Sequence, residues 1–363
     1  MLKILHKVLD FFIATNKNYI YINTVPDFDD TCRAVVEEAL ANKIKVCVAL
    51  TSKNTTTTPN WAKNAQVYYK YSFMGLWAYH RAKYAMYTHG FVAGAGLCGK
   101  RKVINIWHGM PIKKIGIMDG KKKNMPLFDY TIADNLFFSD IMAKSFGVTK
   151  DRVLINKNPR IDILLRGAVS KKKYGIEERV RIAVWMPTYR KSIAGDVRSD
   201  GDVDADIFKG GVDFSSINNA FAEKNIVCFV KPHPMSGVIV DDLKNFSNII
   251  FISDEILVRR YGGSTYEILS VADLLITDVS SVYLDYIVLE RDVIIYCPDF
   301  EEYKRSRGFS FEVENIIHQK VCKNLTDLIC EINSLDVGKM DFVLRRCEGE
   351  SETKKLFRQI GIM

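Results

Sequence analysis

The sequence lacks the long apolar runs, the paired cysteines and the biased composition that mark several large classes of protein. No uninterrupted apolar run approaches the ~18–20 residues that a membrane-spanning helix needs, which excludes an integral membrane protein. Proline and glycine number only 9 and 22 of 363 residues, and 48% of the residues are hydrophobic, so a folded chain is expected. None of the 8 cysteines belongs to a C-x-x-C pair, which favours a reducing cytosol and predicts no zinc site.

Two common nucleotide-binding motifs are either missing or out of their usual place in the chain. No G-x-x-x-x-G-K-[ST] sequence occurs, which argues against a P-loop nucleotidase. Gly94, Gly96 and Gly99 have the G-x-G-x-x-G spacing, but they do not follow the first expected strand, where a dinucleotide-binding enzyme carries this motif, so such an enzyme is not favoured. The acidic run at residues 202–206 is interpreted as part of a solvated loop, so neither a metal ion nor another cofactor is expected.

Charge is present in both signs but is divided unevenly along the chain. The formal net charge is +8, yet residues 1–180 carry 29 Lys+Arg against 14 Asp+Glu, whereas residues 181–363 carry 22 against 29. The basic half is expected to face an anionic partner, either a membrane surface or a nucleic acid. No nucleic-acid-binding motif accompanies the basic tracts, so nucleic acid is not expected as a partner.

Unbroken apolar segments alternate with helical patterns, which is typical of parallel sheets covered by helices on both faces. The expected strands are residues 19–24, 44–50, 103–107, 130–134, 181–187, 226–232, 248–252, 274–278 and 293–297. The charged stretch at residues 171–181 is the expected seam between two α/β domains, 1–174 and 175–363. Two doubly wound domains would leave a cleft at the carboxyl ends of their strands, where such folds bind ligands.

Residues 1–17 predict an amphipathic helix at the start of the chain. Charged and polar residues at positions 3, 6, 7 and 10 interrupt the apolar run that a signal peptide needs. The apolar face would either lie on a membrane or pack on the body of the protein. We favour packing, because this is the usual role of an amphipathic helix.

The first motif, WHGMPIKK at residues 107–114, follows an expected strand. Gly109 permits a tight turn with close approach of a ligand, and His108 is of the residue type that most often acts as a general base near neutral pH. Lys113 and Lys114 would attract a phosphate. The alternative is a capped turn that carries a surface histidine.

The second motif is KPHP, residues 231–234, at the end of another apolar strand. The two prolines stop the strand and fix the backbone around His233, so that its imidazole lies beside the ammonium group of Lys231. This arrangement suits the neutralisation of charge on a phosphoryl group. A structural histidine between prolines is the alternative.

The third motif, TDVSSVYLDY at residues 277–286, joins a buried strand to a helix. Ser280 and Ser281 lie where a helix starts, and the free N–H groups there bind phosphate. Capping alone would explain one serine. Further phosphate contacts are expected from Thr188 and Arg190 after one strand and from Arg307 and Gly308 after another. Together these clusters indicate phosphoryl or glycosyl transfer from a nucleotide donor.

The chain resembles the CDP-glycerol glycerophosphotransferase family, the teichoic-acid and capsule polyol-phosphate transferases. The segments that carry the resemblance lie between about residues 103 and 312: WHGMPIKKIG, NPRIDIL, WMPTYR, VKPHP, ITDVSSVYLDY and YCPDFEEYKRSRGFSFE. The resemblance implies a GT-B-like pair of Rossmann-type domains, with an acceptor-side N-terminal domain and a donor-binding C-terminal domain. It also implies transfer of a polyol phosphate from a CDP-activated donor with release of CMP. Met110, Lys157 and Lys231 depart from the residues usual in the family.

The resemblance also implies roles for individual residues. His108 would deprotonate the acceptor hydroxyl, and His233 would steady the transferring phosphate or the departing CMP. The donor would be bound by Thr188, Arg190, Lys231, Asp278, Ser280, Ser281, Asp285, Arg307 and Gly308. Contacts to the acceptor or to phosphate would come from Trp107, Lys113, Lys114 and Arg160.

The expected function is therefore transfer of glycerol phosphate from CDP-glycerol to a hydroxyl of a cell-surface polymer, a teichoic acid or a capsular polysaccharide. The acceptor would be a saccharide or a lipid-linked polymer. The protein would be cytoplasmic, peripheral on the inner face of the plasma membrane. Three alternatives stay open: a CDP-ribitol-dependent transferase, a GT-B glycosyltransferase that uses a nucleotide sugar, and a non-catalytic basic protein that binds a membrane or a nucleic acid.

Overall fold

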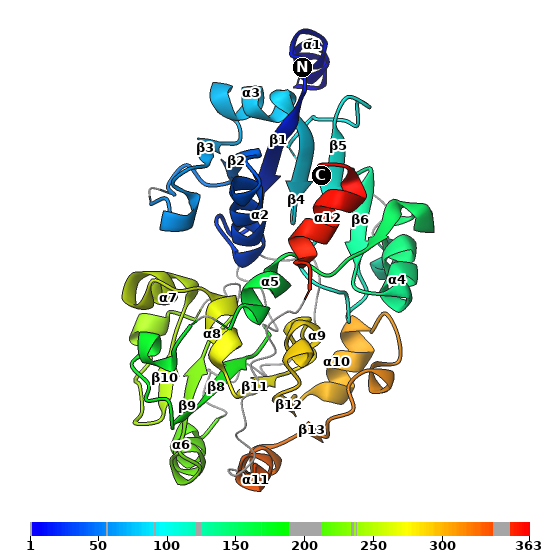
Figure 1. Ribbon diagram of the computed structural model, residues 1–363. Coiled ribbons are helices and arrows are strands. Elements are labelled where there is room, and N and C mark those ends of the chain that lie inside the picture. The colour runs from blue at the N-terminus through cyan, green and yellow to red at the C-terminus, as the bar shows by residue number, and fades with distance from the viewer. Residues whose placement is uncertain are drawn as a thin grey trace. The chain divides into compact units, whose positions relative to one another are not determined.

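The chain folds into two compact units. The computed structural model describes residues 2–55, 57–90, 92–120, 125–167, 169–188, 212–233, 236, 238–336 and 349–363. Unit 1 comprises Met1–Pro111, Ile115–Ile163 and Cys347–Met363, and unit 2 comprises Ile112–Lys114 and Leu164–Arg346. Each unit has its own parallel sheet and its own hydrophobic core (Figure 1).

The sheet of unit 1 has seven parallel strands in the order β3-β2-β1-β4-β5-β6-β7. Their bounds are β1 (Asn16–Asn23), β2 (Lys45–Leu50), β3 (Gln66–Tyr69), β4 (Ala82–Tyr87), β5 (Lys102–Asn105), β6 (Tyr130–Ala133) and β7 (Val153–Ile155). Strand β1 is central, and Tyr21 pairs with Cys47 on one side and with Ala85 on the other. Its last five residues are all buried, because helices cover both faces of the sheet.

The helices of unit 1 lie before, between and after its strands along the chain, and the last of them before unit 2, α5, ends within unit 2. Their bounds are α1 (Leu2–Phe12), α2 (Asp30–Ala41), α3 (Phe73–Arg81), α4 (Leu136–Phe146), α5 (Arg160–Leu165) and α12 (Glu352–Ile360). Asp29 caps α2 by accepting a hydrogen bond from the Cys32 backbone N–H at 2.8 Å. Asn135 caps α4 in the same way through the Phe138 N–H. These caps fix where the loops that follow β1 and β6 end.

Unit 2 has a six-stranded parallel sheet in the order β10-β9-β8-β11-β12-β13. The strands are β8 (Arg181–Met186), β9 (Ile226–Val230), β10 (Ile249–Phe251), β11 (Leu274–Thr277), β12 (Asp292–Tyr296) and β13 (Val321–Cys322). The helices are α6 (Phe214–Glu223), α7 (Asp254–Tyr261), α8 (Thr265–Val271), α9 (Val282–Tyr286), α10 (Phe300–Arg307) and α11 (Leu325–Ser334).

Both sheets reverse their winding direction beside the first strand of the unit. The reversal lies between β1 and β4 in unit 1 and between β8 and β11 in unit 2. This order is that of a doubly wound fold, in which ligands bind outside the carboxyl ends of the strands near the reversal. The expected α/β class with two Rossmann-type sheets is confirmed. Strands β3 and β4 were not predicted, because their residues lie in a segment dominated by aromatic side chains. The edge strands β7 and β13 were not predicted either, because they are only three and two residues long.

The boundary between the units differs from the expected division at residues 174 and 175. The chain leaves unit 1 after Ile163 and returns to it at Cys347. The segment that precedes Tyr174 is tied to unit 2 because Lys171 forms a buried ion pair with Asp273 at 2.8 Å.

The C-terminal helix α12 completes the core of unit 1, although it lies within the range expected for the second domain. Leu356, Phe357 and Ile360 are buried in the same cluster as the residues of β1 and α2, and α12 lies against α2 (Figure 1). The Asp162 carboxylate accepts hydrogen bonds from the backbone N–H groups of Glu352 at 2.7 Å and Thr353 at 2.9 Å. Apolar burial and capping of the helix start therefore both attach α12 to unit 1.

Candidate functional site

The turn after β5 in unit 1 carries the first motif in an unusual backbone conformation. Trp107 has φ +58°, in the left-handed region that residues with a β-carbon seldom adopt, and Gly109 has φ +129°. The Trp107 N–H donates to the side-chain oxygen of Asn105, the last residue of β5, at 3.0 Å. Such strained turns persist where the surrounding structure holds them, and they are concentrated at functional sites.

Side chains from the loop after β7 hold this turn. Asn158 donates from its amide group to the Trp107 carbonyl oxygen at 3.3 Å. The guanidinium group of Arg160 donates to the His108 carbonyl oxygen at 3.1 Å. The structure thus brings three of the expected residues, Trp107, His108 and Arg160, together at the carboxyl edge of unit 1.

The contact of His108 with Thr88 defines which ring nitrogen is available for chemistry. The His108 side chain is exposed, and its Nδ1 lies 3.4 Å from the Thr88 carbonyl oxygen. A carbonyl oxygen only accepts, so we assign the proton to Nδ1. In the neutral ring this leaves a lone pair on Nε2, which is what a general base requires.

His89 lies directly against the His108 ring and was missed in the sequence. The two rings stack with centroids 4.1 Å apart and planes 11° from parallel. Burial, assisted by the positive charge of Arg160, lowers the pKa of His89 to about 4. His89 follows β4, and recognising β4 as a strand would have placed a Thr-His-Gly sequence at a strand end.

Asp29 is a second residue at this edge that sequence patterns did not single out. It follows the loop after β1 and caps α2. Burial raises the pKa of Asp29 to about 7, although the hydrogen bond from the Cys32 N–H and the charge of Arg160 both lower it. Asp29 therefore titrates near neutral pH beside the loop that carries Arg160.

In unit 2 strand β9 ends at Val230, and residues 231–233 of the KPHP sequence follow it, as predicted. Lys231 is buried, and its Nζ donates to the Asp254 carboxylate at 3.0 Å. Thr265 donates to the other oxygen of that carboxylate at 2.7 Å. Burial, followed by the charges of Lys231 and Lys113, lowers the pKa of His233 to about 4. His233 is therefore a neutral ring at pH 7, and Asp254 is a partner of Lys231 that the sequence did not reveal.

Two carboxylates of the third motif are held by hydrogen bonds within unit 2. Asp278, at the end of β11, accepts hydrogen bonds from the backbone N–H of Thr188 at 3.1 Å and from the Thr188 hydroxyl. Asp285, on α9, accepts from the Tyr266 hydroxyl at 2.5 Å. Asp278 thereby fixes the segment that follows β8 beside the end of β11, at the reversal point of the sheet.

The serines of the third motif lie at the start of α9. The Ser280 N–H donates to the Asp278 carbonyl oxygen at 2.9 Å, which closes a tight turn after β11. Ser281 precedes the first residue of α9 and makes no side-chain capping hydrogen bond. The capping interpretation of Ser281 is therefore not supported.

The two lysines of the first motif belong to unit 2, whereas Trp107 and His108 belong to unit 1. Lys113 forms an isolated antiparallel bridge with Phe309, and the Lys114 N–H donates to the Gly308 carbonyl oxygen at 3.3 Å. Gly308 has φ +67°, and a β-carbon there would lie 3.3 Å from the Lys114 side chain. The first motif and the Arg-Gly-Phe sequence therefore meet, which no spacing in the sequence predicts.

Some expected residues lie outside what the structure describes. These are Arg190, the acidic run at residues 202–206, Pro234 of the KPHP sequence and the side chain of Arg307. Within the described ranges, no group of three or more His, Cys, Asp or Glu residues is placed to hold a metal ion.

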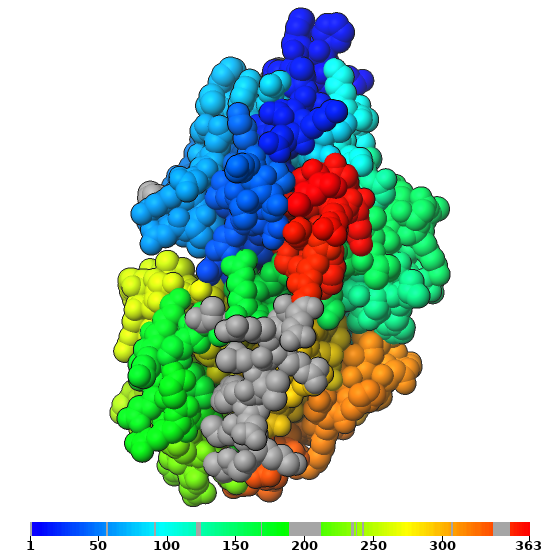
Figure 2. All heavy atoms as spheres, viewed as in Figure 1, coloured from blue at the N-terminus to red at the C-terminus, as the bar shows by residue number. Residues whose placement is uncertain are grey.

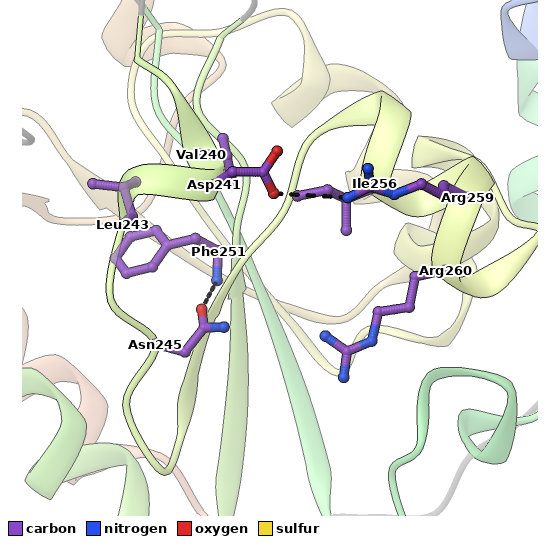
Figure 3. Close-up of a pocket in the computed structure, with 8 residues that line it drawn as sticks. All are labelled: Val240, Asp241, Leu243, Asn245, Phe251, Ile256, Arg259 and Arg260. Atoms are coloured by element: carbon purple, nitrogen blue, oxygen red, sulfur yellow. Dashed lines mark hydrogen bonds and ion pairs between the residues drawn. The ribbon is translucent and has the colours of Figure 1, made fainter.

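A pocket of about 300 Å³ lies beside the edge strand β10 of unit 2 (Figure 3). Its lining residues are Val240, Asp241, Leu243, Asn245, Phe251, Ile256, Arg259 and Arg260. Arg259 lies 3.7 Å from the Asp241 carboxylate across the pocket. None of the expected site residues lines this pocket.

A family model decides the relationship of the chain to known proteins. The model for CDP-glycerol:poly(glycerophosphate) glycerophosphotransferases matches residues 5–344. The chain belongs to this family. The resemblance drawn from the motifs is thereby confirmed.

Curated relatives of the family are similar over much of the chain. The teichoic acid glycerol-phosphate transferase of Staphylococcus aureus (strain NCTC 8325 / PS 47) is 25% identical over 67% of this chain and 64% of its own length. The teichoic acid ribitol-phosphate polymerase TarK of the same strain is 26% identical over 65% of this chain and 46% of its own length. The teichoic acid poly(glycerol phosphate) polymerase of Bacillus spizizenii (strain ATCC 23059 / NRRL B-14472 / W23) is 24% identical over 85% and 81%. The chain thus spans between 42% and 64% of the length of the first three curated relatives it matches.

Solved structures support the fold. A structure of the wall teichoic acid polymerase TagF aligns with a TM-score of 0.73 and 18% identity, covering 98% of this chain and 88% of that chain. UDP-GlcNAc 2-epimerase from Neisseria meningitidis aligns with a TM-score of 0.53 and 11% identity, covering 94% and 98%. The expected GT-B-like class of fold is confirmed by the similarity to TagF.

Proposed function

We propose that this protein transfers glycerol phosphate from CDP-glycerol to a hydroxyl group of a cell-surface polymer such as a teichoic acid, with release of CMP. Membership of the glycerophosphotransferase family is the observation that carries the proposal. The chemistry of the two carboxyl edges agrees with it, because one offers a base and the other offers positive charge.

Unit 1 supplies the base in this mechanism. His108 accepts the proton of the acceptor hydroxyl on Nε2, while its Nδ1–H stays directed at the Thr88 carbonyl oxygen. The hydroxyl oxygen then attacks the β-phosphorus of the donor. The bond between that phosphorus and the bridging oxygen breaks, and CMP leaves with the electron pair.

Unit 2 supplies the donor site. Lys231 and Lys113 both act electrostatically on His233, so positive charge is gathered at this edge of the sheet. That charge, with the N–H groups at the start of α9, stabilises the negative charge that develops on the transferring phosphoryl group. His233 is neutral at pH 7 because its pKa is about 4, so it acts as a hydrogen-bond donor to phosphate rather than as a cation.

The exposed face of helix α1 is relevant to the location of the protein in the cell. The expectation that its apolar face packs on the body of the protein is wrong, since His6 is the buried residue of α1. The exposed apolar side chains are Leu2, Ile4, Leu5, Val8, Phe11 and Phe12, with Phe73 and Met74 of the contacting helix α3. Figure 2 shows the dark blue atoms of the N-terminus projecting from unit 1.

Polar contacts hold the other side of α1. His6 Nδ1 lies 3.0 Å from His80 Nε2. Asp10 lies 2.7 Å from His80 Nδ1 and accepts a hydrogen bond from Arg101 at 3.0 Å. Because this polar side faces the protein, the apolar stripe faces outward.

The proposal therefore includes docking of α1 on the anionic inner face of the plasma membrane. An amphipathic helix binds such a surface through its apolar face and through neighbouring basic residues, here Lys3 and Lys7. Within the described ranges, no helix has the length and apolar content to cross a membrane.

The reaction is tested by incubating the protein with a teichoic acid acceptor and CDP-glycerol and measuring the CMP released. CDP-ribitol and UDP-N-acetylglucosamine serve as competing donors. CDP-ribitol is included because a glycerol-phosphate transferase and a ribitol-phosphate polymerase are 25% and 26% identical to this chain. We expect CMP with CDP-glycerol at a rate well above that with the other donors. No acceptor-dependent CMP from CDP-glycerol would overturn the proposal.

A further inference from the structure

We propose that His89 is a positioning residue that holds the His108 imidazole in the orientation of a general base, by offering a flat ring on which it stacks. The proposal rests on the proposed function, because it assumes that His108 accepts the acceptor proton. His89 does not belong to any of the motifs that relate the chain to its family.

The two rings are held by the same residue. His89 Nδ1 lies 3.1 Å from the Thr88 hydroxyl oxygen, and His108 Nδ1 lies 3.4 Å from the Thr88 carbonyl oxygen. Thr88 is fully buried, and its own N–H donates to the carbonyl oxygen of Asn23, at the end of β1, at 3.2 Å. The carboxyl end of β4 therefore acts as a fixed support from which both rings are placed.

The stack defines the plane of the His108 ring more closely than its contact with the Thr88 carbonyl oxygen does. The His108 side chain is exposed, and a contact of 3.4 Å to a carbonyl oxygen is long for a hydrogen bond. Trp107 and His89 both have ring centroids 4.1 Å from the His108 centroid, but only His89 lies nearly parallel, at 11° against 32°. Of these two neighbouring rings, His89 is the one whose face opposes rotation of the His108 ring out of its plane.

The charge state of His89 suits this role and argues against His89 as the base. Burial and the nearby Arg160 guanidinium keep its pKa at about 4, so the ring is neutral at pH 7 and is too weak a base to compete with an exposed histidine. When His108 takes up a proton, a cationic neighbour 4.1 Å away would oppose it, whereas the face of a neutral ring favours it. His89 therefore supports His108 both before and after proton transfer.

Two substitutions test whether His89 acts on His108 through its flat ring or through its nitrogen atoms. His89→Phe keeps a flat face but removes both nitrogens, and His89→Ala removes the face. For CMP release we expect His89→Ala to lower kcat by about tenfold to a hundredfold with KM within about twofold of wild type, because the base is misplaced but the substrates still bind. We expect His89→Phe to restore kcat to within about threefold of wild type. Wild-type kcat in His89→Ala, or equal loss in both variants, would overturn the proposal.

An NMR measurement, which needs no turnover, tests the positioning role of His89 separately from the proposed reaction. The ring resonances of His108, assigned with His108→Asn, are compared by NMR in wild type, His89→Ala and His89→Phe. We expect the His108 ring protons to move when the stacked ring is removed and to stay near their wild-type positions with phenylalanine. If the wild type releases no CMP, the proposed function fails and the NMR comparison alone decides the stack; unchanged His108 resonances in His89→Ala would overturn the positioning role.

Discussion

At the scale of single residues, the candidate base depends on the strained backbone that precedes it. A left-handed φ at Trp107 turns the chain sharply after β5, so that His108 emerges at the edge of the sheet. Arg160 and Asn158 hold the two carbonyl oxygens of this turn, and Thr88 fixes the tautomer of the ring. With the proton on Nδ1, the lone pair lies on Nε2, the nitrogen that accepts the acceptor proton in the proposed mechanism.

Replacement of His108 by alanine tests this assignment directly. We expect the rate of CMP release to fall by about a hundredfold to ten-thousandfold, the usual contribution of general base catalysis. The circular dichroism spectrum should be unchanged, because the side chain is exposed. His318→Ala, at an exposed histidine of unit 2, is the matched control and should retain activity. A His108→Ala protein with near-normal turnover would remove His108 from the mechanism.

Asp29 gives a prediction on the pH dependence of stability. Its pKa is about 7 in the fold and near 3.8 when unfolded, so the ionised form is disfavoured by folding. The resulting cost is absent below pH 4, grows between pH 4 and 7, and is complete above pH 7. Asp29→Asn keeps a capping oxygen but carries no charge, so it should gain stability over wild type as pH rises, by at most about 4 kcal/mol.

The measurement is the urea midpoint of both proteins at pH 4.5 and at pH 8. Asp213→Asn provides the control, because Asp213 also caps a helix but is fully exposed, and its hydrogen bonds with Ser216 lower its pKa. That variant should show no gain at high pH. Parallel pH profiles for Asp29→Asn and Asp213→Asn would contradict the raised pKa of Asp29.

The residues that the sequence did and did not reveal differ in how they are encoded. His108, Lys231 and His233 lie in short segments where glycine or proline stops a strand, so local chemistry marks them. His89 and Asp254 carry no such mark. Their importance arises from pairing with residues 19 and 23 positions away on other loops, which requires the sheet to be built first.

At the scale of elements, α1 shows that an amphipathic pattern does not determine what covers the apolar face. Its polar side packs inward because a histidine and an aspartate find buried partners on α3 and on the segment before β5. The sequence pattern of a helix that packs on its protein is the same as that of a helix that packs on a lipid surface. Which face of α1 packs on the protein depends on polar partners that lie about 70 to 90 residues further along the sequence.

The exposed end of α1 provides the test of membrane docking. Phe11 and Phe12 are 77% and 78% exposed, so Phe11→Ser/Phe12→Ser should leave the fold intact while removing much of the apolar surface. We expect wild type to sediment with vesicles that contain anionic lipid, less so as salt rises, and the double variant to remain largely in the supernatant. Leu136→Ser/Phe137→Ser, at an exposed apolar pair on α4, should sediment like wild type. If the Phe11→Ser/Phe12→Ser variant sediments with the vesicles as wild type does, α1 is not the docking element.

At the scale of the whole molecule, the fold class was readable but the division into units was not. Unbroken apolar strands predicted two parallel sheets, because strand burial on both faces leaves a local signal. The return of the chain to unit 1 leaves no local signal, since α12 resembles any short amphipathic helix until its buried partners on α2 and β1 are known. The expected division at the charged stretch of residues 171–181 therefore assigned α12 to the second domain, although α12 belongs to the core of unit 1.

The corrected division predicts which fragment folds. A fragment of residues 1–174 lacks α12 and so loses the burial of Leu356, Phe357 and Ile360, each at most 1% exposed. Burial of such side chains contributes roughly 1.5–3 kcal/mol each, so the total of roughly 5–9 kcal/mol rivals the whole stability of an ordinary domain. We expect this fragment to aggregate or to lack a cooperative thermal transition.

The same fragment joined through a flexible linker to residues 347–363 should regain that transition, because both the apolar partners and the groups capped by Asp162 are restored. Leu356→Asp in the joined chain is the control, since it keeps the added length but places a charge in the core. Circular dichroism during heating measures all three proteins. Equal transitions with and without residues 347–363 would mean that α12 is dispensable, and the core of unit 1 would then have to be complete without its last helix.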